Sequence, residues 1–507
     1  PIHYTRLSLL ANGYIYYTIY FVICQVFFLE KFITFAAMEK IIGRKGEFEK
    51  LSKYMESDRG EFVAVYGRRR VGKTFLIRQY YNDKFDFYVT GIIDGSREEQ
   101  MAAFNDALTA YGHTGPKAKT WMEAFAHLAA LLQKKKKNGK RLVVFIDELP
   151  CFDTPNARFV HALGHFWNSQ GSWINNIFFV VCGSATSWMI KNVIDNHGGL
   201  HNRITHELHL RPFDLHDTED YLISRGMRWN RLSVIQIYMA LGGIPYYLGM
   251  LDKTMSVAEN IDALFFGDDA EMRKEYPRLF KSLFKDPENY IALINAFAEC
   301  KQGMSRKEIV QLPQFKDNGH LSEMLDNLVN CDFLRLYNNG TKQNSGIYQL
   351  TDFYTLFYNK FCKKRTTDDH FWRNHINTTL MNNWHGLAFE RVCMYHFRNI
   401  IRALRLDAIH TEFYSWRSKL SNPGAQIDMV IDRSDNVTTI CEVKYSQGDY
   451  LLHKSEYEKI LNRISTFSDE KNRRKAIQPV LITTFSLKQN EYSDIFHRTL
   501  TMDNLFD

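Results

Sequence analysis

A glycine-rich loop that joins an apolar run to a helical pattern constrains this chain more than any other feature. The apolar run is Glu61-Phe-Val-Ala-Val-Tyr66, and the loop that follows it is Gly67-Arg-Arg-Arg-Val-Gly72-Lys73-Thr74. The run predicts a buried parallel strand, and Thr74 to Tyr81 has the pattern of a helix. A strand, a glycine loop and a helix in this order are the context of a phosphate-binding loop. The sequence therefore predicts an α/β domain that binds a nucleotide beside a parallel sheet.

The residue types in this loop suit the phosphates of ATP. Gly67 and Gly72 let backbone amides approach the phosphates, because no Cβ stands in the way. Lys73 places a positive charge between the β- and γ-phosphates, and Thr74 supplies a magnesium ligand. We therefore expect ATP and Mg²⁺ as cofactors. The expected nucleotide-binding positions of the loop are Gly67, Arg68, Arg69, Arg70, Val71, Gly72, Lys73 and Thr74.

A second apolar run supplies the carboxylates that ATP hydrolysis needs. Arg141-Leu-Val-Val-Phe-Ile-Asp147-Glu148 predicts a buried strand that ends in two acidic residues. We expect Asp147 to hold magnesium and Glu148 to orient the attacking water. Ile177 to Ser184 predicts another central strand, with Ser184 at the same sheet edge as a sensor of the γ-phosphate. An ordinary strand end is the alternative for Ser184.

These motifs resemble those of the prokaryotic AAA-type ATPases first recognised in archaea, which are related to STAND-like signalling ATPases with a C-terminal nuclease-like domain. The resemblance covers most of the span from Met38 to about residue 280. It rests on the glycine loop, on Phe-Ile-Asp147-Glu148, on Cys-Gly-Ser184, on Gly242-Gly-Ile-Pro245, and on Ile42-Gly43-Arg44 with Glu47.

The same resemblance implies roles for residues outside the loop. It implies that Gly43 and Arg44 lie near the nucleotide base and that Pro245 marks a helical lid. It also implies that Arg203 is an arginine finger or sensor, although a single arginine on a loop is commonly a surface charge. A homo-oligomer is the assembly that the resemblance implies.

Between these motifs and the C-terminal tail, the sequence predicts three helices followed by a hairpin. Ser305-Arg-Lys-Glu308 is a capping box that begins the second helix. Two alternating strands flank Asn338-Asn-Gly340, which is a hairpin signal. This order predicts a winged helix, which similar ATPases also carry. The third helix exposes Glu323 and Asp326, which would repel phosphates, so we favour packing or partner docking over DNA reading.

The tail presents three acidic residues and a lysine in the order that PD-(D/E)xK, restriction-endonuclease-like nucleases use. Glu390 lies on a predicted helix, Asp428 opens a predicted strand, and Glu442-Val-Lys444 ends the next strand. Side chains two residues apart on a strand share a face, so Glu442 and Lys444 point the same way. We expect Asp428 and Glu442 to bind magnesium, Glu390 to support the site, and Lys444 to stabilise charge or position water. The alternative is a nuclease-like fold that serves as a non-catalytic binding module.

The expected fold class is α/β: a P-loop NTPase parallel-sheet core with a helical lid, a winged-helix middle domain and a C-terminal α/β nuclease-like domain. A chain of 507 residues is too long for one hydrophobic core. The expected boundaries are 1–37 for an apolar leader, 38–212 for the ATPase core, 213–285 for the lid, 286–350 for the winged helix, 351–383 for an aromatic-rich connector and 384–507 for the restriction-endonuclease-like domain.

Three further features of the sequence limit the expected partners, redox state and location: the net charge, the cysteines and the N-terminal segment. The net charge of +7 is compatible with DNA as a partner without requiring it. The eight cysteines include no Cys-x-x-Cys pair, which indicates reduced thiols in a cytoplasmic protein and no structural zinc. Residues 8–29 carry no charge and have the length of a membrane span. We favour a mis-extended start, with Met38 as the true first residue, over a membrane anchor.

These observations leave competing functions. In the first, ATP-driven rearrangement or oligomerisation is coupled to cleavage of DNA. In the second, a signalling or regulatory ATPase uses its tail only to bind a partner. A third, weaker hypothesis is a membrane-tethered ATPase, which rests on residues 8–29 alone.

Overall fold

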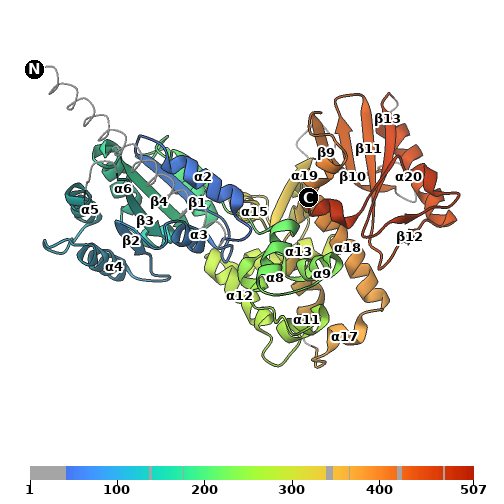
Figure 1. Cartoon of the computed structure of the whole chain (residues 1–507), viewed down its shortest axis with the longest axis horizontal. Helices are drawn as coiled ribbons and strands as arrows, with labels where there is room; N and C mark the ends of the chain where they lie inside the picture. Colours follow the sequence, from blue (N-terminus) through green and yellow to red (C-terminus); the bar gives the residue numbers. More distant parts are fainter. Residues whose placement is uncertain are drawn as a thin grey trace, which may run out of the picture. The chain divides into compact units, whose positions relative to one another are not determined.

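The computed structural model describes residues 41–135, 140–174, 176–338, 346–364, 366–418, 425–471 and 474–507 (Figure 1). Residues 8–29, for which an anchor or a mis-extended start was considered, lie outside the described residues. Among the helices that are described, none is long and apolar enough to cross a membrane.

The described chain forms two compact units. The first contains the described residues up to Ala64, Lys73–Cys182 and His197–Leu208. The second contains Val65–Gly72, Gly183–Asn196 and His209–Asp507. These units do not coincide with the six expected domains, whose boundaries stay a prediction.

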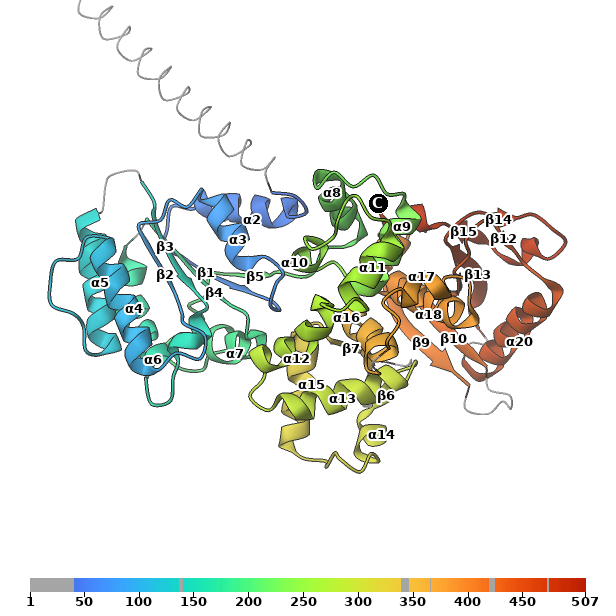
Figure 2. The ribbon, with the colours of Figure 1, turned by 90° about the horizontal axis from the view of Figure 1, so that it is seen from below.

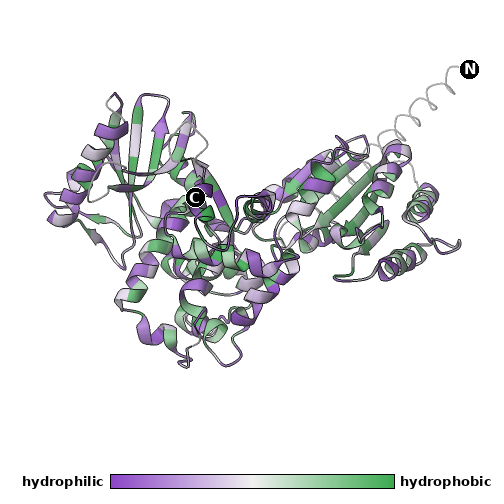
Figure 3. Ribbon diagram, turned by 180° about the vertical axis from the view of Figure 1, so that it is seen from behind, coloured by the Kyte–Doolittle hydropathy of each residue, from purple (hydrophilic) through white to green (hydrophobic). Residues whose placement is uncertain are grey.

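A five-stranded sheet forms the centre of the first unit. Its strands lie in the order β2-β3-β4-β1-β5, and β2, β3 and β4 run parallel. Every residue of β3 and β4 is buried, as their unbroken apolar sequences predict. Figure 3 shows these strands as a hydrophobic centre. The strand bounds are β1 Glu61–Tyr66, β2 Phe87–Thr90, β3 Leu142–Asp147, β4 Ile177–Gly183 and β5 His206–His209.

Helices cover both faces of this sheet (Figure 2). Phe178 and Phe179 are neighbours on β4, so their side chains point to opposite faces of the sheet and meet a helical layer on each side. Phe178 lies 5.9 Å from Tyr81, which follows α3, and Phe179 lies 5.7 Å from Phe166 of α6, as ring-centroid distances. The helix bounds are α2 Lys45–Met55, α3 Lys73–Tyr80, α4 Arg97–Ala110, α5 Trp121–Lys135 and α6 Phe159–Ser169.

The second unit begins with helices and continues into a small sheet. Helix α7 spans Thr186–Met189, and the next group is α8 Leu215–Ser224, α9 Arg231–Leu241, α10 Pro245–Leu248, α11 Val257–Phe265 and α12 Glu271–Leu283. The following segment contains α13 Pro287–Glu299, β6 Met304–Ser305, α14 Arg306–Val310, α15 Gly319–Asn330, β7 Leu334–Asn338 and β8 Gly346–Leu350, with strand order β6-β8-β7. The Ser305 and Glu308 capping box is formed. The winged-helix function of this segment stays a prediction.

A mixed sheet ends the second unit, with strand order β15-β13-β11-β10-β9. Strands β9, β10 and β11 pair antiparallel, whereas β11, β13 and β15 pair parallel. Helix α20 packs on one face, where Phe467 lies 5.1 Å from Trp416. The bounds are α16 Phe353–Phe357, α17 Phe371–His375, α18 Thr379–Tyr395, α19 Phe397–Ala403, β9 Thr411–Arg417, β10 Gln426–Arg433, β11 Val437–Lys444, β12 Tyr450–Leu451, α20 Lys454–Lys471, β13 Ala476–Thr483, β14 Leu487–Lys488 and β15 Arg498–Leu500.

Candidate functional site

Asp147 is the buried acidic residue of the first unit that ends a central strand. It is the last residue of β3, and 3% of its surface is exposed. Its Oδ2 accepts a hydrogen bond from Thr74 Oγ1 at 2.9 Å, and its Oδ1 accepts from the backbone amide of Glu148 at 2.9 Å. The Cys182 thiol of β4 also donates to Oδ1. Burial raises the pKa of Asp147, and these neutral donors oppose that rise.

The start of α3 lies beside the Asp147 carboxylate, because Thr74 in its first turn donates a hydrogen bond to that carboxylate. Helix α3 begins at Lys73, whose side chain is buried at 5% exposure. A helix N-terminus carries a partial positive charge and unpaired amides, and a lysine there adds a full charge. The combination favours an anion such as a phosphate group.

The oxygens of Thr74 and Asp147 fit a magnesium ion. Hydroxyl and carboxylate oxygens are the ligands that Mg²⁺ prefers, and these two lie 2.9 Å apart at the end of the sheet. The loop before them also suits phosphate, because Gly72 has a φ of +93° and no heavy atom within 4 Å of the place where a Cβ would stand. Gly67 has a φ of +142°, and a Cβ there would meet the Leu210 carbonyl oxygen at 2.2 Å. Both glycines are therefore required by the backbone.

Cys182 is a contact that sequence reasoning did not assign. The Cys-Gly-Ser184 motif was recognised for Ser184, which follows directly after β4. Because β3 and β4 are adjacent, the last residues of β4 come within reach of Asp147, and alternation along β4 could have identified the thiol.

Glu148 adopts a left-handed conformation with φ of 46°, an uncommon backbone state for this residue type.

Two loop arginines use their side chains for contacts within the second unit. Arg68 is buried, forms an ion pair with Asp352 and stacks over Phe333 with its guanidinium carbon 4.6 Å from the ring centroid. Arg70 pairs with Glu275 at 2.8 Å. Asp352 also accepts from the Thr355 amide and so caps α16. The side chains of Arg68 and Arg70 are thus engaged in ion pairs, and the nucleotide roles of these two residues and of the half-buried Arg69 stay predictions.

The remaining predicted nucleotide contacts have the following local settings. Gly43 has a φ of +70°, and Arg44 is buried and pairs with Glu47 at 3.5 Å. Arg203 is exposed on a turn in which its amide donates to the Leu200 carbonyl at 3.0 Å. Val71 is fully buried. The roles of these residues and of Ser184 stay predictions.

A second polar cluster lies in the tail and gathers the predicted nuclease residues. Lys444 Nζ lies 3.1 Å from Glu442 Oε1, as the shared strand face predicts. Burial, and after it the negative charge of Asp428, raises the pKa of Glu390. The register of β10 shifts between Ile427 and Val430, so Asp428 stands on a bulge. Bulges are common beside functional sites because they re-aim a side chain.

Cations outside the predicted set hold these carboxylates. Nη1 of Arg463, on α20, donates to both carboxylate oxygens of Glu442 at 2.8 and 2.7 Å. Lys301 lies 3.1 Å from Glu390, and Lys444 also pairs with Glu456 at 3.2 Å. Arg463 and Lys301 were missed because α20 and the segment after α13 are remote in sequence from the Glu-x-Lys strand. The sequence around Arg463 shows only an arginine spaced one helical turn from an apolar residue, and this pattern does not indicate that the arginine contacts a carboxylate.

The tail cluster does not fit a magnesium ion as it is arranged. Arg463 and Lys444 already occupy the Glu442 carboxylate, and burial raises the pKa of Glu390 to about 7, which favours its neutral form. Among the described residues, no three His, Cys, Asp or Glu side chains are grouped as metal ligands would be. The predicted magnesium role of Asp428 and Glu442 therefore stays a prediction without support from this arrangement.

Comparison with known proteins gives one family match and two curated relatives. Residues 42–251 match the ATPase domain family that is described as predominantly from Archaea. An uncharacterized protein of Methanocaldococcus jannaschii is 23% identical over 413 residues, which cover 80% of this chain and 87% of that protein. An uncharacterized ATP-binding protein of the same organism is 40% identical over 43 residues, which cover 8% of this chain and 73% of that protein.

Solved structures also show similarity. A Walker-type ATPase of Pyrococcus abyssi matches with a TM-score of 0.43 and 17% identity, over 64% of this chain and 97% of that one. The ORC2 protein of Aeropyrum pernix, in ADPNP–ADP complexes, matches with a TM-score of 0.30 and 18% identity, over 61% of this chain and 90% of that one. Both scores are below 0.5, so the assignment rests on the family match.

The family match spans the glycine loop, Asp147 and Glu148, and it ends before the tail cluster. It confirms the predicted archaeal-type ATPase, whereas the nuclease-like tail stays a prediction. Residues 42–251 of this chain therefore match an archaeal-type ATPase domain.

Proposed function

We propose that this chain binds and hydrolyses ATP with Mg²⁺, and that the loop from Gly67 to Thr74 holds the phosphates. The observation that carries the proposal is the 2.9 Å hydrogen bond between Thr74 and the buried Asp147. It joins the start of α3 to the end of β3, which are the two places where a phosphate-binding strand–loop–helix unit needs its hydroxyl and carboxylate.

The residues of this proposed ATP site then have separate roles. Lys73 and the first amides of α3 bind the phosphate oxygens, and Thr74 and Asp147 hold the magnesium ion. When bound, the ion neutralises charge on the phosphates. Glu148 orients the attacking water and accepts its proton, because its carboxylate follows directly after Asp147 at the same strand end.

Substitutions at Lys73 and Glu148 test this division of tasks. Lys73→Ala should abolish ATP binding, because it removes the charge that holds the phosphates. Glu148→Gln should preserve binding and block turnover, because the amide cannot accept a proton. Nucleotide titration and phosphate release on both variants are the measurements. An equal loss of ATP affinity in the two variants would show that Glu148 binds nucleotide and does not act on water.

We further propose that the protein is a regulatory ATPase whose nuclease-like tail is a binding module that does not cleave DNA. The specific observation is that Nη1 of Arg463 donates to both carboxylate oxygens of Glu442, at 2.8 and 2.7 Å. A carboxylate that is neutralised by a guanidinium and by Lys444 attracts a further cation weakly. Arg68 and Arg70 of the loop form ion pairs with Asp352 and Glu275. These ion pairs support the proposed regulatory role, because a movement of the loop would then be transmitted to α16 and α12.

Incubation of plasmid DNA with the protein tests the tail. We expect no nicking with Mg²⁺, with or without ATP. Nicking by the wild-type chain that disappears in Asp428→Ala and in Lys444→Ala would instead establish the nuclease. Phosphate release measured in parallel separates this outcome from failure of the ATPase.

A further inference from the structure

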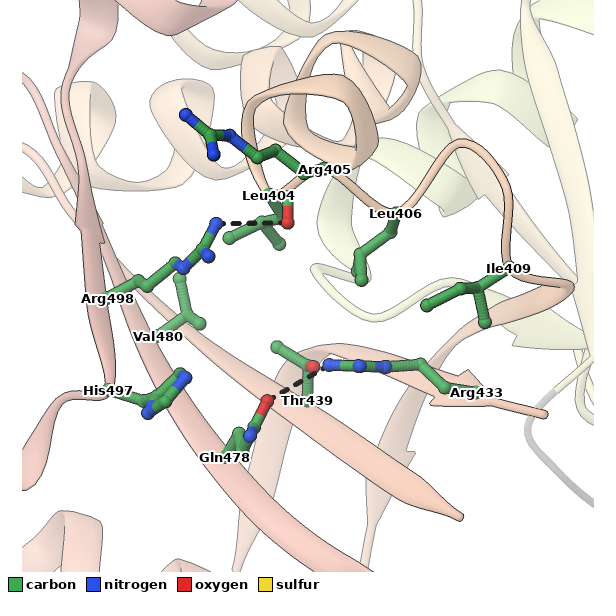
Figure 4. A pocket seen from close by; sticks show the side chains of 10 residues that line it. All are labelled: Leu404, Arg405, Leu406, Ile409, Arg433, Thr439, Gln478, Val480, His497 and Arg498. Carbon is green, nitrogen blue, oxygen red and sulfur yellow. Dashed lines mark hydrogen bonds between the residues drawn. The ribbon is translucent and has the colours of Figure 1, made fainter. Parts of the chain in front are cut away.

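The face of the C-terminal sheet opposite Glu442 and Lys444 carries a cavity of about 210 Å³ (Figure 4). Its floor is formed by side chains that share one face of four adjacent strands. Thr439 pairs in register with Gln478, and Val480 pairs with Arg498, so these residues point the same way. Thr439 and Glu442 are three residues apart on β11, which places them on opposite faces. The cavity is therefore separate from the tail cluster.

A turn after α19 forms the other wall of this cavity. Leu404, Leu406 and Ile409 line it, and Leu404 ends α19 as its C-cap. Arg405 follows in the left-handed conformation with a φ of +59°. That conformation favours glycine or asparagine at the end of a helix. An arginine stands there despite this preference, and it lines the cavity.

The lining is strongly cationic and contains no acidic residue. Its charged or chargeable members are Arg405, Arg433, His497 and Arg498. Figure 4 shows Arg498 and Arg433 entering from opposite sides. Each is held by a neutral oxygen: Arg498 donates to the Leu404 carbonyl at 3.0 Å, and Arg433 donates to the Gln478 side chain at 3.0 Å.

Counter-charges around the cavity are few. Arg433 also pairs with Asp435, which lies outside the lining. Within the described part of the chain, neither Arg405 nor Arg498 forms an ion pair with a carboxylate. A concave site lined by one sign of charge attracts ions of the other sign. The arrangement therefore favours an anion.

The size and the donors of the cavity narrow the class of anion. Sites that enclose whole drug-sized ligands measure roughly 300 to 1,000 Å³, so this cavity admits an end group and not a whole cofactor. Guanidinium groups from two sides, the Thr439 hydroxyl and the Gln478 amide match the several oxygens of a terminal phosphate. The apolar residues Leu406 and Val480 suit the carbon atoms that carry it.

We propose that this cavity binds a terminal phosphate, that is, a phosphomonoester of a free nucleotide or of a nucleic-acid strand end. The proposal goes beyond the ATPase function, because the ATP loop lies elsewhere in the chain. It also does not depend on metal chemistry at Glu442.

The test compares ligands that differ only in the phosphate. Binding is measured for a fluorescent oligonucleotide with a 5′-phosphate and for the same strand with a 5′-hydroxyl, and likewise for AMP and adenosine. The protein is the full-length Lys73→Ala chain with EDTA, so that neither the ATP loop nor metals contribute to the binding. We expect the phosphate to improve affinity about tenfold or more, since charge-assisted hydrogen bonds to arginine are lost without it. If only AMP shows the effect, the source is a free nucleotide; if the oligonucleotide shows it, the source is a strand end.

Two variants assign the effect to the cavity. Arg498→Gln should remove the preference for phosphate, whereas Arg398→Gln, an exposed arginine of α19 outside the lining, should retain it. Arg498→Lys should restore part of the preference, because it keeps the charge and loses the fork geometry. Equal binding of phosphorylated and hydroxyl strands, together with AMP affinity that is unchanged in Arg498→Gln, would overturn the proposal.

Discussion

Asp147 of the first unit and Glu442 of the second are both strand carboxylates that the sequence assigned to magnesium, yet their surroundings differ in charge. Asp147 accepts from the Thr74 hydroxyl, the Cys182 thiol and a backbone amide, which are neutral donors. Glu442 accepts from Arg463 and lies 3.1 Å from Lys444, which are cations. Neutral donors position a carboxylate and leave its charge uncompensated, whereas cations remove the charge that a metal ion needs.

The comparison teaches that the residue type alone does not make a metal ligand. A magnesium ion loses part of its water shell on binding, and the carboxylate charge must offset that cost. The hydrogen-bond donors given above for Asp147 are all neutral, although burial raises the pKa of this carboxyl. Glu442 would first have to release Arg463. The following predictions either break or sharpen this difference, from the largest expected effect to the smallest.

Asp147→Asn should reduce ATP turnover by about 100-fold or more, because it removes the charge that holds magnesium while it keeps the shape of the side chain. Affinity for ATP without Mg²⁺ should change little, since Lys73 still binds the phosphates. Phosphate release and nucleotide titration with and without Mg²⁺ are the measurements. Full activity in Asp147→Asn would erase the proposed difference between the two carboxylates.

Arg463→Gln should increase the affinity of the tail for a divalent cation by about tenfold, because it frees the Glu442 carboxylate from a charge-assisted contact. Mn²⁺ titration followed by electron paramagnetic resonance, on the nucleotide-free protein, measures the change. The double variant Arg463→Gln with Asp428→Asn should lose the gain, which assigns it to this cluster. Arg398→Gln serves as the matched control. Tight Mn²⁺ binding by the wild-type tail would contradict the blocking role of Arg463.

Glu390→Gln should stabilise the protein at pH 8 by about 1 kcal/mol and change stability little at pH 4.5. Burial and Asp428 raise the pKa of Glu390 from 4.5 to about 7. The stability that neutral Glu390 provides is therefore present below about pH 4.5 and is lost as the pH rises through about 7. The gain is smaller than the full shift implies, because Gln also loses the ion pair with Lys301.

Thermal midpoints of wild type and Glu390→Gln across pH 4.5 to 8 measure this effect. Glu412→Gln, at an exposed position of β9, is the control and should show no such pH dependence. Parallel stability curves for wild type and Glu390→Gln would mean that Glu390 is already ionised at low pH.

Local patterns predicted the elements of the ATP site closely. The expected strand from Glu61 to Tyr66 has the bounds of β1, and the expected helix from Thr74 to Tyr81 differs from α3 by one residue at each end. The run before Asp147 predicted β3 for the same reason. Each signal lies within a few consecutive residues, because an unbroken apolar run and a glycine loop determine their own conformation.

The sequence by itself determined the strand, loop and helix of the ATP site, the strand that ends at Asp147, and the shared face of Glu442 and Lys444, because these follow from neighbours along the chain. Only the tertiary structure decided which charges meet. Arg463 reaches Glu442 from α20, Arg68 is paired with Asp352 across 284 positions, and Arg498 shares a cavity with Arg405. Coulomb interactions depend on distance in space, and no periodicity in the sequence records which distant side chains the packing brings together.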